Sequence, residues 1–222
     1  MASSPIYQQR VVDVRTQDVY RVEIFYRDEA GDAPAAVLPV GVDRNFHAVG
    51  DMLRDLLEAS SRLPEDIQHL ISINVANSIF FDGDLTHLVM SSLQDLPYGL
   101  SIEVSQLGDL PEPRKINALF SEFRKINCTV ELDNFGGAFS KNPQVFSEYS
   151  FDSMKLDARF VQNALADDRR LRLLSLVSDM VKAQGKRIIA TGVASKADSD
   201  KLAGLGIVLQ QGEFIHSPQP VM

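Results

Sequence analysis

The sequence has little cysteine, no long apolar run and no excess of basic residues. A single cysteine, Cys128, excludes an intramolecular disulfide bond and a metal site built from several thiolates. It directly precedes an apolar segment, so we interpret it as a buried structural thiol. No apolar run approaches the roughly 18 residues that a membrane span needs. The net charge of −8 and the isoelectric point near 5.0 argue against a general nucleic-acid or anionic-membrane surface.

The first residues, Met1 to Pro5, have neither the basic nor the apolar part of a secretory signal peptide. We therefore expect a cytoplasmic protein. Low-complexity linkers and internal repeats are also absent from the sequence. Its 222 residues are 45% hydrophobic and 23% charged, which is typical of a globular domain with a sizeable core. We predict one domain over residues 1–222.

Strand-like and helix-like segments alternate along most of the chain. Two strands come first, over 7–14 and 18–27, and their short connection predicts an antiparallel pair. The Gly-, Ala- and Pro-rich segment 27–41 predicts an exposed loop, and Asp43 is a candidate N-cap for the next helix. Further strands are predicted over 70–75, 100–104, 129–133, 151–156, 187–190 and 207–209. Helices are predicted over 44–60, 83–95, 111–126, 143–149, 168–184 and 195–203, and Gly185 is expected to end the fifth of them.

This alternation predicts a parallel β-sheet with helices between its strands. About six parallel strands after an antiparallel first pair fit a modified TIM-type (β/α) barrel, an α/β fold. An open doubly wound sheet is the alternative. No Gly-x-Gly-x-x-Gly sequence follows the first strand to support that alternative. We therefore predict the barrel.

Polar residues recur near the carboxyl ends of the apolar strands. In chain order they are Glu23, Asn74, Glu103, Asp133, Asn134, Lys155, Thr191 and Gln211. The strand ends of a parallel barrel surround one mouth, so these side chains are expected to converge. Three carboxylates, an amide and a lysine in one place are typical of an Mg²⁺ or Mn²⁺ site that acts on a phosphodiester.

Motifs around these residues are similar to those of a known family. They are Tyr7–Asp13, Glu23–Phe25, Asn74, Ile102–Gln106, Asp133–Ala138, Met154–Asp157, Ala190–Ala194 and Gln211–Glu213. Together they resemble EAL domains, barrel phosphodiesterases that linearise cyclic di-GMP, over essentially the whole chain. The resemblance implies nucleotide contacts from Gln8, Arg27, Asn74, Glu103, Asp133, Lys155 and Gln211. It implies metal ligands at Glu23, Asn74, Glu103 and Asp133.

Two positions depart from the pattern of active family members, which hold two metals. Asn134 stands where the family has the second Asp of Asp-Asp-Phe-Gly, and Thr191 where it has the Glu of Ala-Glu-Gly-Val. Gln106 replaces a Glu that anchors the following loop in the family. Fewer carboxylates remain to offset the mutual repulsion of two divalent ions. We therefore expect a remnant metal site without bound metal and no catalytic residue, although Lys155 is retained.

These departures favour a catalytically degenerate EAL-like regulatory domain of cyclic di-GMP signalling that binds and does not hydrolyse. The expected partner is cyclic di-GMP, a regulatory protein or both, without nucleic acid or membrane, and a homodimer is left open. The alternative is a weak phosphodiesterase that uses Mg²⁺ or Mn²⁺ and yields the linear dinucleotide; otherwise no cofactor is expected. The basic segment Asp167–Arg172 is interpreted as the solvated start of a helix, with a partner-binding patch as the alternative.

Overall fold

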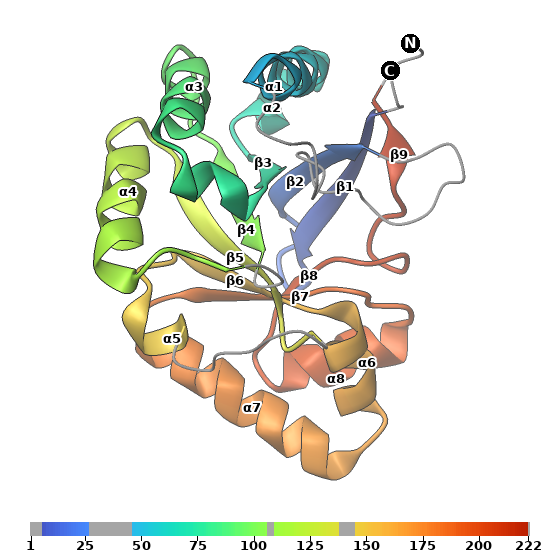
Figure 1. Cartoon of the computed structure of the whole chain (residues 1–222). Coiled ribbons are helices and arrows are strands. Elements are labelled where there is room, and N and C mark those ends of the chain that lie inside the picture. The colour runs from blue at the N-terminus through green and yellow to red at the C-terminus, as the bar shows by residue number, and fades with distance from the viewer. Residues whose placement is uncertain (1–5, 27–45, 106–108, 138–144, 222) are drawn as a thin grey trace.

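Eight strands close into one barrel in the computed structural model, which describes residues 6–26, 46–105, 109–137 and 145–221 (Figure 1). The order around the barrel is β2-β3-β4-β5-β6-β7-β8-β1, and β1 pairs back onto β2. The strands are β1 Ile6–Asp13, β2 Val19–Tyr26, β3 Ile71–Val75, β4 Ser101–Ser105, β5 Thr129–Phe135, β6 Ser153–Leu156, β7 Arg187–Ala190 and β8 Leu209–Gln210. A short strand, β9 (Gln219–Pro220), pairs with β1.

Strand direction follows the predicted pattern. β1 runs antiparallel to both of its barrel neighbours, β2 and β8. From β2 to β8 each strand is parallel to the next. The predicted modified (β/α) barrel with an antiparallel first strand is therefore confirmed. Parallel strands of this kind bring their carboxyl ends to one mouth, which is where the candidate site was predicted.

Helices pack along much of the outside of the barrel, and β1 and β9 form its remaining side (Figure 1). The helices are α1 Phe46–Ser61, α2 Glu65–Gln68, α3 Gly83–Gln94, α4 Pro113–Lys125, α5 Val145–Glu148, α6 Ala158–Leu165, α7 Asp168–Ala183 and α8 Lys196–Gly204, with a 3₁₀ helix η1 at Asn77–Phe81. The sequence analysis did not predict α2, η1, α6 or β9. The predicted loop 27–41, the candidate cap Asp43 and Gln106 lie outside the described residues. No helix in the described ranges is both long and apolar enough to cross a membrane.

Local sequence signals explain where several helices begin and end. Asp82 caps α3 by accepting hydrogen bonds from two backbone N–H groups, and Asp167 does the same for α7. Ser195 caps α8 by accepting one from Asp198 N. At the other end of α7, Gly185 adopts a φ of +71°, which glycine reaches without steric cost. The predicted stop at Gly185 is confirmed.

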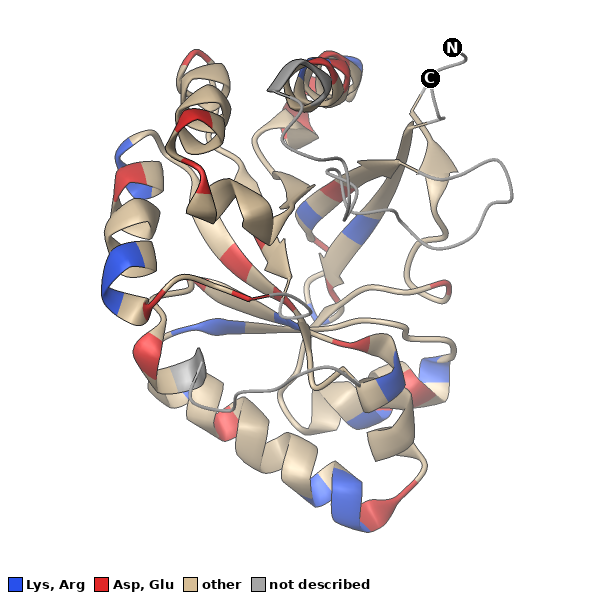
Figure 2. Ribbon diagram, in the orientation of Figure 1, with Lys and Arg blue, Asp and Glu red and all other residues tan. Residues whose placement is uncertain are grey.

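The strands have an apolar outer face and a largely polar inner face. Outward residues such as Ile24, Ile102 and Leu132 are fully buried against the helices. Inside the barrel a small separate apolar cluster is formed by Val11, Ile189 and Leu209. Much of the remaining interior is polar or charged, and Figure 2 shows acidic and basic positions on the barrel strands themselves. Because a parallel-barrel interior is usually filled by branched apolar side chains, this polar interior marks the candidate site.

Candidate functional site

Glu23, Glu103 and Lys155 meet inside the barrel and are almost completely buried. Lys155 Nζ lies 2.8 Å from Glu23 Oε2 and 2.7 Å from Glu103 Oε2. These side chains come from β2, β4 and β6, and Gln211 directly follows β8. Alternate strands contribute the side chains of one layer in a barrel of this type, which explains why residues so far apart in the sequence converge. The lysine ammonium group therefore bridges two of the predicted metal ligands.

Two side-chain amides donate the remaining hydrogen bonds to the Glu23 carboxylate. Asn74 Nδ2 donates a hydrogen bond of 2.7 Å to Glu23 Oε1, and Gln211 Nε2 donates one of 2.8 Å to Glu23 Oε2. On the second carboxylate, Glu103 Oε1 accepts a hydrogen bond of 2.5 Å from Ser72 Oγ. Every oxygen of these two carboxylates thus accepts a hydrogen bond from the protein, which is what a buried charge requires to be tolerated.

Asn134 and Thr191 make contacts that suit an amide and a hydroxyl. The Asn134 side-chain amide donates to Asp133 Oδ2 and, at 3.4 Å, to Ser105 Oγ. Its backbone has a φ of +60°, a conformation that asparagine tolerates better than most residues. Thr191 Oγ1 donates a hydrogen bond of 2.6 Å to the backbone carbonyl of Leu156. Neither position places a carboxylate at the mouth.

Glu131 is a further buried carboxylate that the sequence analysis did not single out. It lies on β5 beside Glu103 in the parallel register and is fully buried. Its Oε2 atom accepts a hydrogen bond from Ser153 Oγ, whereas Oε1 has no hydrogen-bond partner among the described residues. A signal was present in the sequence: Glu131 precedes Asp133 by two residues, and strand residues two apart point to the same face.

The four carboxyl groups and the lysine influence one another strongly. Burial alone would raise the pKa of Glu23, but the charge of Lys155 and three hydrogen bonds lower it below its ordinary value. Burial and the negative charge of Glu23 raise the pKa of Glu103 well above its ordinary value, although Lys155 opposes this. Burial likewise raises the pKa of Asp133 to about 6. Glu23 therefore ionises more readily than an ordinary glutamate, whereas Glu103 and Asp133 keep their protons to a higher pH.

The described residues do not fit a two-metal centre. No group of three or more His, Cys, Asp or Glu side chains in the described ranges is arranged to hold a metal ion. Glu23 and Glu103 are paired with the Lys155 ammonium group through their Oε2 atoms, so a divalent ion held by these carboxylates would lie close to a positive charge. Positions 134 and 191 supply an amide and a hydroxyl where hard divalent ions prefer anionic oxygen.

Most of the predicted nucleotide contacts lie together. Asn74 and Gln211 bind Glu23 directly, Lys155 bridges Glu23 and Glu103, and the charge of Asp133 interacts with that of Lys155. The remaining two predicted contacts, Gln8 and Arg27, are not part of this group. Arg27 lies outside the described residues.

The structure places Gln8 on the other face of β1. Gln8 pairs with Ile24 across the β1–β2 ladder, whereas its neighbour Gln9 pairs with Glu23. Directly opposed residues of an antiparallel pair share a face, so Gln9 is the glutamine that faces the barrel interior. Gln9 Nε2 donates a hydrogen bond of 2.9 Å to the backbone carbonyl of His216. The residue that the structure brings next to Glu23 is therefore Gln9.

Comparison with known proteins identifies the family. The family model of the EAL domain matches residues 3–218. The chain is 25% identical over 179 residues to the cyclic di-GMP phosphodiesterase PdeL of Escherichia coli strain K12, covering 76% of this chain and 49% of PdeL. It is 26% identical over 227 residues to the probable cyclic di-GMP phosphodiesterase PdeG of the same strain, covering 96% of this chain and 44% of PdeG. The chain thus spans about half the length of these relatives.

Solved structures show the same fold. Klebsiella pneumoniae BlrP1, in a calcium and cyclic di-GMP complex, matches with a TM-score of 0.80 at 20% identity, covering 97% of this chain and 55% of that one. The EAL domain of Mycobacterium smegmatis DcpA matches with a TM-score of 0.77 at 16% identity, covering 100% of this chain and 94% of that one. At such identities, these matches establish the architecture of the barrel and not its chemistry.

Proposed function

This chain belongs to the EAL domain family, and we propose that it is a regulatory member that acts in cyclic di-GMP signalling by binding, without hydrolysing the nucleotide. The resemblance of its sequence motifs to that family is thereby confirmed. The observation that carries the proposal is the bridge of Lys155 between Glu23 and Glu103, together with the missing carboxylates at Asn134 and Thr191. These features leave the barrel with the family's framework but a poor set of ligands for paired metals.

Charge balance supports the loss of hydrolysis. Two divalent ions about 4 Å apart repel each other by on the order of 15 kcal/mol at an effective dielectric constant of about 20. Carboxylate ligands must offset that repulsion, and two of those expected from the family pattern are absent here. Glu23 and Glu103 are in addition already neutralised in part by the lysine. A two-metal site that lowers the pKa of a water molecule for attack on phosphorus is therefore strongly disfavoured.

The same charge balance favours a protein over the nucleotide as the bound partner. Cyclic di-GMP carries two phosphodiester anions, and the barrel interior presents four carboxyl groups around Lys155. Lys155 is paired with Glu23 and Glu103, so its charge is not free to bind a phosphate that enters without a metal. Nucleotide binding would then depend on Arg27, because a guanidinium group binds phosphate without a metal.

Turnover of cyclic di-GMP tests the proposal. The purified chain is incubated with the nucleotide in Mg²⁺ and, separately, in Mn²⁺, and the linear dinucleotide is quantified by chromatography. We expect no more product than with a Glu23→Ala variant. Glu122→Ala, at an exposed residue of α4, controls for effects of purification. Product that forms with the unmodified chain and disappears with Glu23→Ala would overturn the proposal and support the weak phosphodiesterase.

Calorimetric titration with cyclic di-GMP then distinguishes a domain that binds a protein from one that binds the nucleotide. Absence of heat at high nucleotide concentration is the expected result for a protein-binding domain. Micromolar or tighter binding without turnover would instead identify a nucleotide receptor. If such binding occurs, Arg27→Ala should abolish it, because that guanidinium group would supply the phosphate contacts.

A further inference from the structure

Two arginines contact the same tyrosine at the amino-terminal end of the barrel, opposite the mouth. Arg187 is the first residue of β7, and Arg21 lies near the start of β2. The central carbon of each guanidinium group lies 5.1 Å from the centre of the Tyr20 ring, within the range of a cation–π contact. Arg187 Nη1 also donates a hydrogen bond of 3.1 Å to Tyr20 Oη. One aromatic side chain thus holds two permanent positive charges near each other.

A β-bulge determines the position of Tyr20. In the β1–β2 ladder Val11 pairs with Arg21 and Val12 pairs with Val19, which leaves Tyr20 as the extra residue. A bulge redirects the side chain of its extra residue and is common at the rims of barrels. The Tyr20 ring packs against the interior apolar cluster that contains Val11. The irregular pairing of β1 with β2 therefore positions the ring that both arginines contact.

Hydroxyl groups lie beside the two arginines. Arg21 Nη2 donates a hydrogen bond of 3.5 Å to Thr129 Oγ1. Ser101 pairs with Thr129 in the β4–β5 ladder, and its buried Oγ atom has no hydrogen-bond partner in the part of the chain that the structure describes. The hydroxyls of Tyr20 and Thr129 accept from the arginines, so each keeps its own hydrogen to donate. We call the group formed by Tyr20, Arg21, Ser101, Thr129 and Arg187 the barrel floor.

Neither arginine of the barrel floor forms an ion pair with a described residue. Arg21 is only 9% exposed, and its Nε atom has no hydrogen-bond partner within the described ranges. A buried guanidinium group is costly unless a counter-charge and hydrogen-bond acceptors accompany it. Donors without acceptors at a buried cation therefore indicate a site for an anion.

Two carboxylates near this end of the barrel have other partners. Asp13, at the end of β1, accepts a hydrogen bond from the backbone N–H of Arg15 and lies 3.9 Å from its Nε atom. Asp152 directly precedes β6. It pairs with Arg124 at 3.1 Å and accepts a hydrogen bond from the backbone N–H of Val130. Neither carboxylate neutralises the barrel floor by direct contact.

Two further carboxyl groups in this region form no ion pair with a described residue. Asp18 is exposed in the β1–β2 turn, where water solvates its charge. Glu131 lies two residues after Thr129 on β5, and its Oε1 atom is a buried acceptor without a partner there. The charge of Glu131 also acts on Lys155, whose pKa it helps to raise. One acceptor shared with the mouth cluster leaves most donors of the barrel floor unsatisfied.

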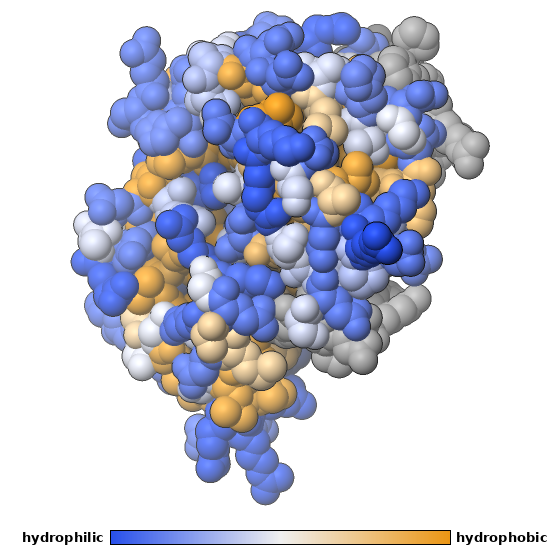
Figure 3. All heavy atoms as spheres, turned by 90° about the vertical axis from the view of Figure 1, so that its left-hand side faces the viewer, coloured by the Kyte–Doolittle hydropathy of each residue, from blue (hydrophilic) through white to orange (hydrophobic). Residues whose placement is uncertain are grey.

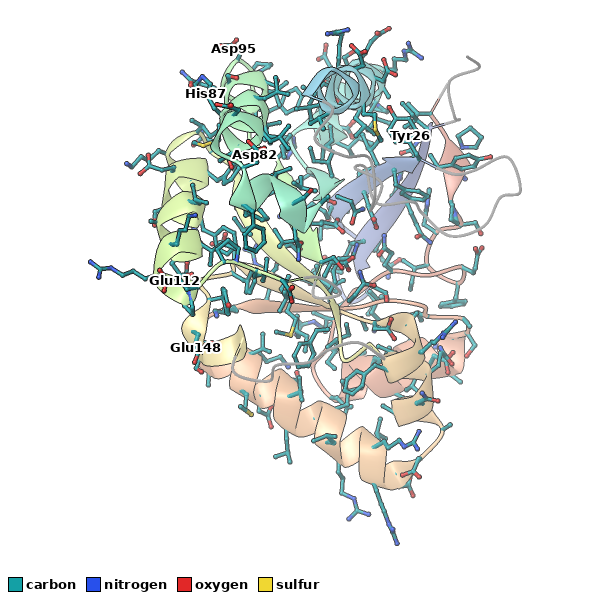
Figure 4. All side chains as sticks on the ribbon, in the orientation of Figure 1. Tyr26, Asp82, His87, Asp95, Glu112 and Glu148 are labelled. Carbon is teal, nitrogen blue, oxygen red and sulfur yellow. The ribbon has the colours of Figure 1, made fainter. Side chains whose placement is uncertain are left out.

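The outer surface of the molecule shows no comparable feature on the sides that the views present. Apolar areas on the face in Figure 3 are interrupted by hydrophilic side chains, as on most protein surfaces. Asp95, Glu112 and Glu148, labelled in Figure 4, are exposed and lie at or beside the outer helices α3, α4 and α5. Such exposed carboxylates contribute to the net charge of −8 but are not part of the barrel floor.

The number and directions of the donors favour phosphate over carboxylate as the bound group. A carboxylate has two oxygens in one plane, whereas a phosphate group has at least three acceptor oxygens that point in different directions. Donors of the barrel floor come from β2, β4, β5 and β7, and therefore from several sides. Guanidinium groups in addition bind phosphate in a bidentate manner without a metal.

We propose that the barrel floor binds a phosphate group, either as inorganic phosphate or as part of a phosphomonoester. Arg21 and Arg187 would donate to its oxygens, and the hydroxyls of Tyr20 and Thr129 would supply further hydrogen bonds. Arg187 is exposed and Tyr20 is partly exposed, so a ligand can reach them from solvent. The site lies at the opposite end of the barrel from the mouth. The inference therefore goes beyond the proposed function and does not depend on it.

Thermal unfolding of the full chain in phosphate tests the proposal. Sodium phosphate replaces sodium chloride at constant ionic strength, and the rise in melting temperature with concentration gives an apparent Kd. We expect a Kd of about 1 mM or tighter. Arg187→Gln should weaken it by a factor of about ten or more, because one of two guanidinium groups is lost. Arg172→Gln, at an exposed arginine of α7, is the matched control and should not change it.

Tyr20→Phe provides a second variant that keeps the ring and removes its hydroxyl group. It should weaken phosphate binding by a factor of about two to ten, which corresponds to one hydrogen bond. Circular dichroism confirms that each variant is folded. General stabilisation by phosphate as a kosmotropic salt would be equal in all variants. Absence of a rise in melting temperature, or an equal rise in Arg187→Gln, would therefore overturn the proposal.

Phenyl phosphate, titrated in the same way, distinguishes the two sources of the phosphate group. Binding at least as tight as that of inorganic phosphate supports a phosphomonoester as the ligand, and weaker binding supports the free ion. Either result supports the proposal when Arg187→Gln weakens it. The assay contains no cyclic di-GMP, so its outcome is independent of the proposed function.

Discussion

Lys155 Nζ lies 2.7 Å from Glu103 Oε2 in a contact that joins β6 to β4 inside the barrel. The same nitrogen lies 2.8 Å from Glu23 Oε2 on β2. One cation thus connects three strands in a place where water is excluded. Removing one partner of a buried ion pair leaves the other as an uncompensated buried charge, which costs far more than the intact pair contributes.

Lys155→Met should therefore destabilise the protein by about 3 to 5 kcal/mol. Methionine keeps much of the length and packing of lysine, so the loss would report chiefly the charge. Urea unfolding at neutral pH measures the change. Lys196→Met is the matched control, because Lys196 forms an exposed ion pair with Asp200, and that pair is expected to contribute at most about 1 kcal/mol. Similar small losses in both variants would contradict the central role of Lys155.

Asp133 should make the folded protein less stable as the pH rises. Its pKa is raised from 3.8 to about 6, so the folded state holds the proton over a range in which the unfolded state has released it. The stability that this proton provides is present at low pH and is lost between about pH 4 and pH 6, by on the order of 3 kcal/mol. The raised pKa of Glu103 acts in the same direction.

Comparison of Asp133→Asn with the unmodified chain isolates that contribution. The free energy of unfolding of the variant, relative to the unmodified chain, should increase as the pH rises from 4 to 7. Asp200→Asn, at an exposed site on α8, should show no such trend. A constant difference across this range for Asp133→Asn would rule out a raised pKa at this carboxyl group.

Restoring the two missing carboxylates should restore a response to metal. We expect Asn134→Asp combined with Thr191→Glu to raise the melting temperature when Mg²⁺ is added, because a ligand that binds only the folded state stabilises it. The unmodified chain should not respond. Adding Glu23→Gln to the double variant should abolish the response, since Glu23 is the central carboxylate of the cluster. If the double variant does not respond, residues other than those at positions 134 and 191 limit metal binding.

Gly136 should not tolerate a side chain. Its φ is +83°, and a Cβ atom at this position would lie 2.5 Å from Cγ of Phe160. Gly136→Ala combines backbone strain with a steric clash, so we expect a loss of about 2 kcal/mol or more in urea unfolding. At Gly204 in α8 a Cβ atom would have no neighbour within 4 Å. Gly204→Ala should be neutral or stabilise by up to about 1 kcal/mol, and an equal loss at both positions would exclude this explanation.

The sequence predicted that polar side chains converge inside the barrel, and this was correct for residues whose position follows from strand order. Glu23, Asn74, Glu103 and Lys155 lie in separate strands, and closure of the barrel brings them together. The convergence does not extend to Gln8, because a shift of one residue moves a side chain to the other face of a strand. The pairing of Gln9 with Glu23 is set by the β1–β2 ladder, which the order of residues alone did not specify.

The sequence by itself determined the barrel, the family and the presence of an amide and a hydroxyl at Asn134 and Thr191, because periodicity, motif spacing and residue identity are all properties of the chain order. Only the tertiary structure decided that Lys155 is paired with Glu23 and Glu103 and that Glu131 shares their interior. Each of these depends on which face a side chain occupies and on what lies opposite it. Burial and distance set the energy of charges and of apolar surface, and both are known only once the strands and helices have packed.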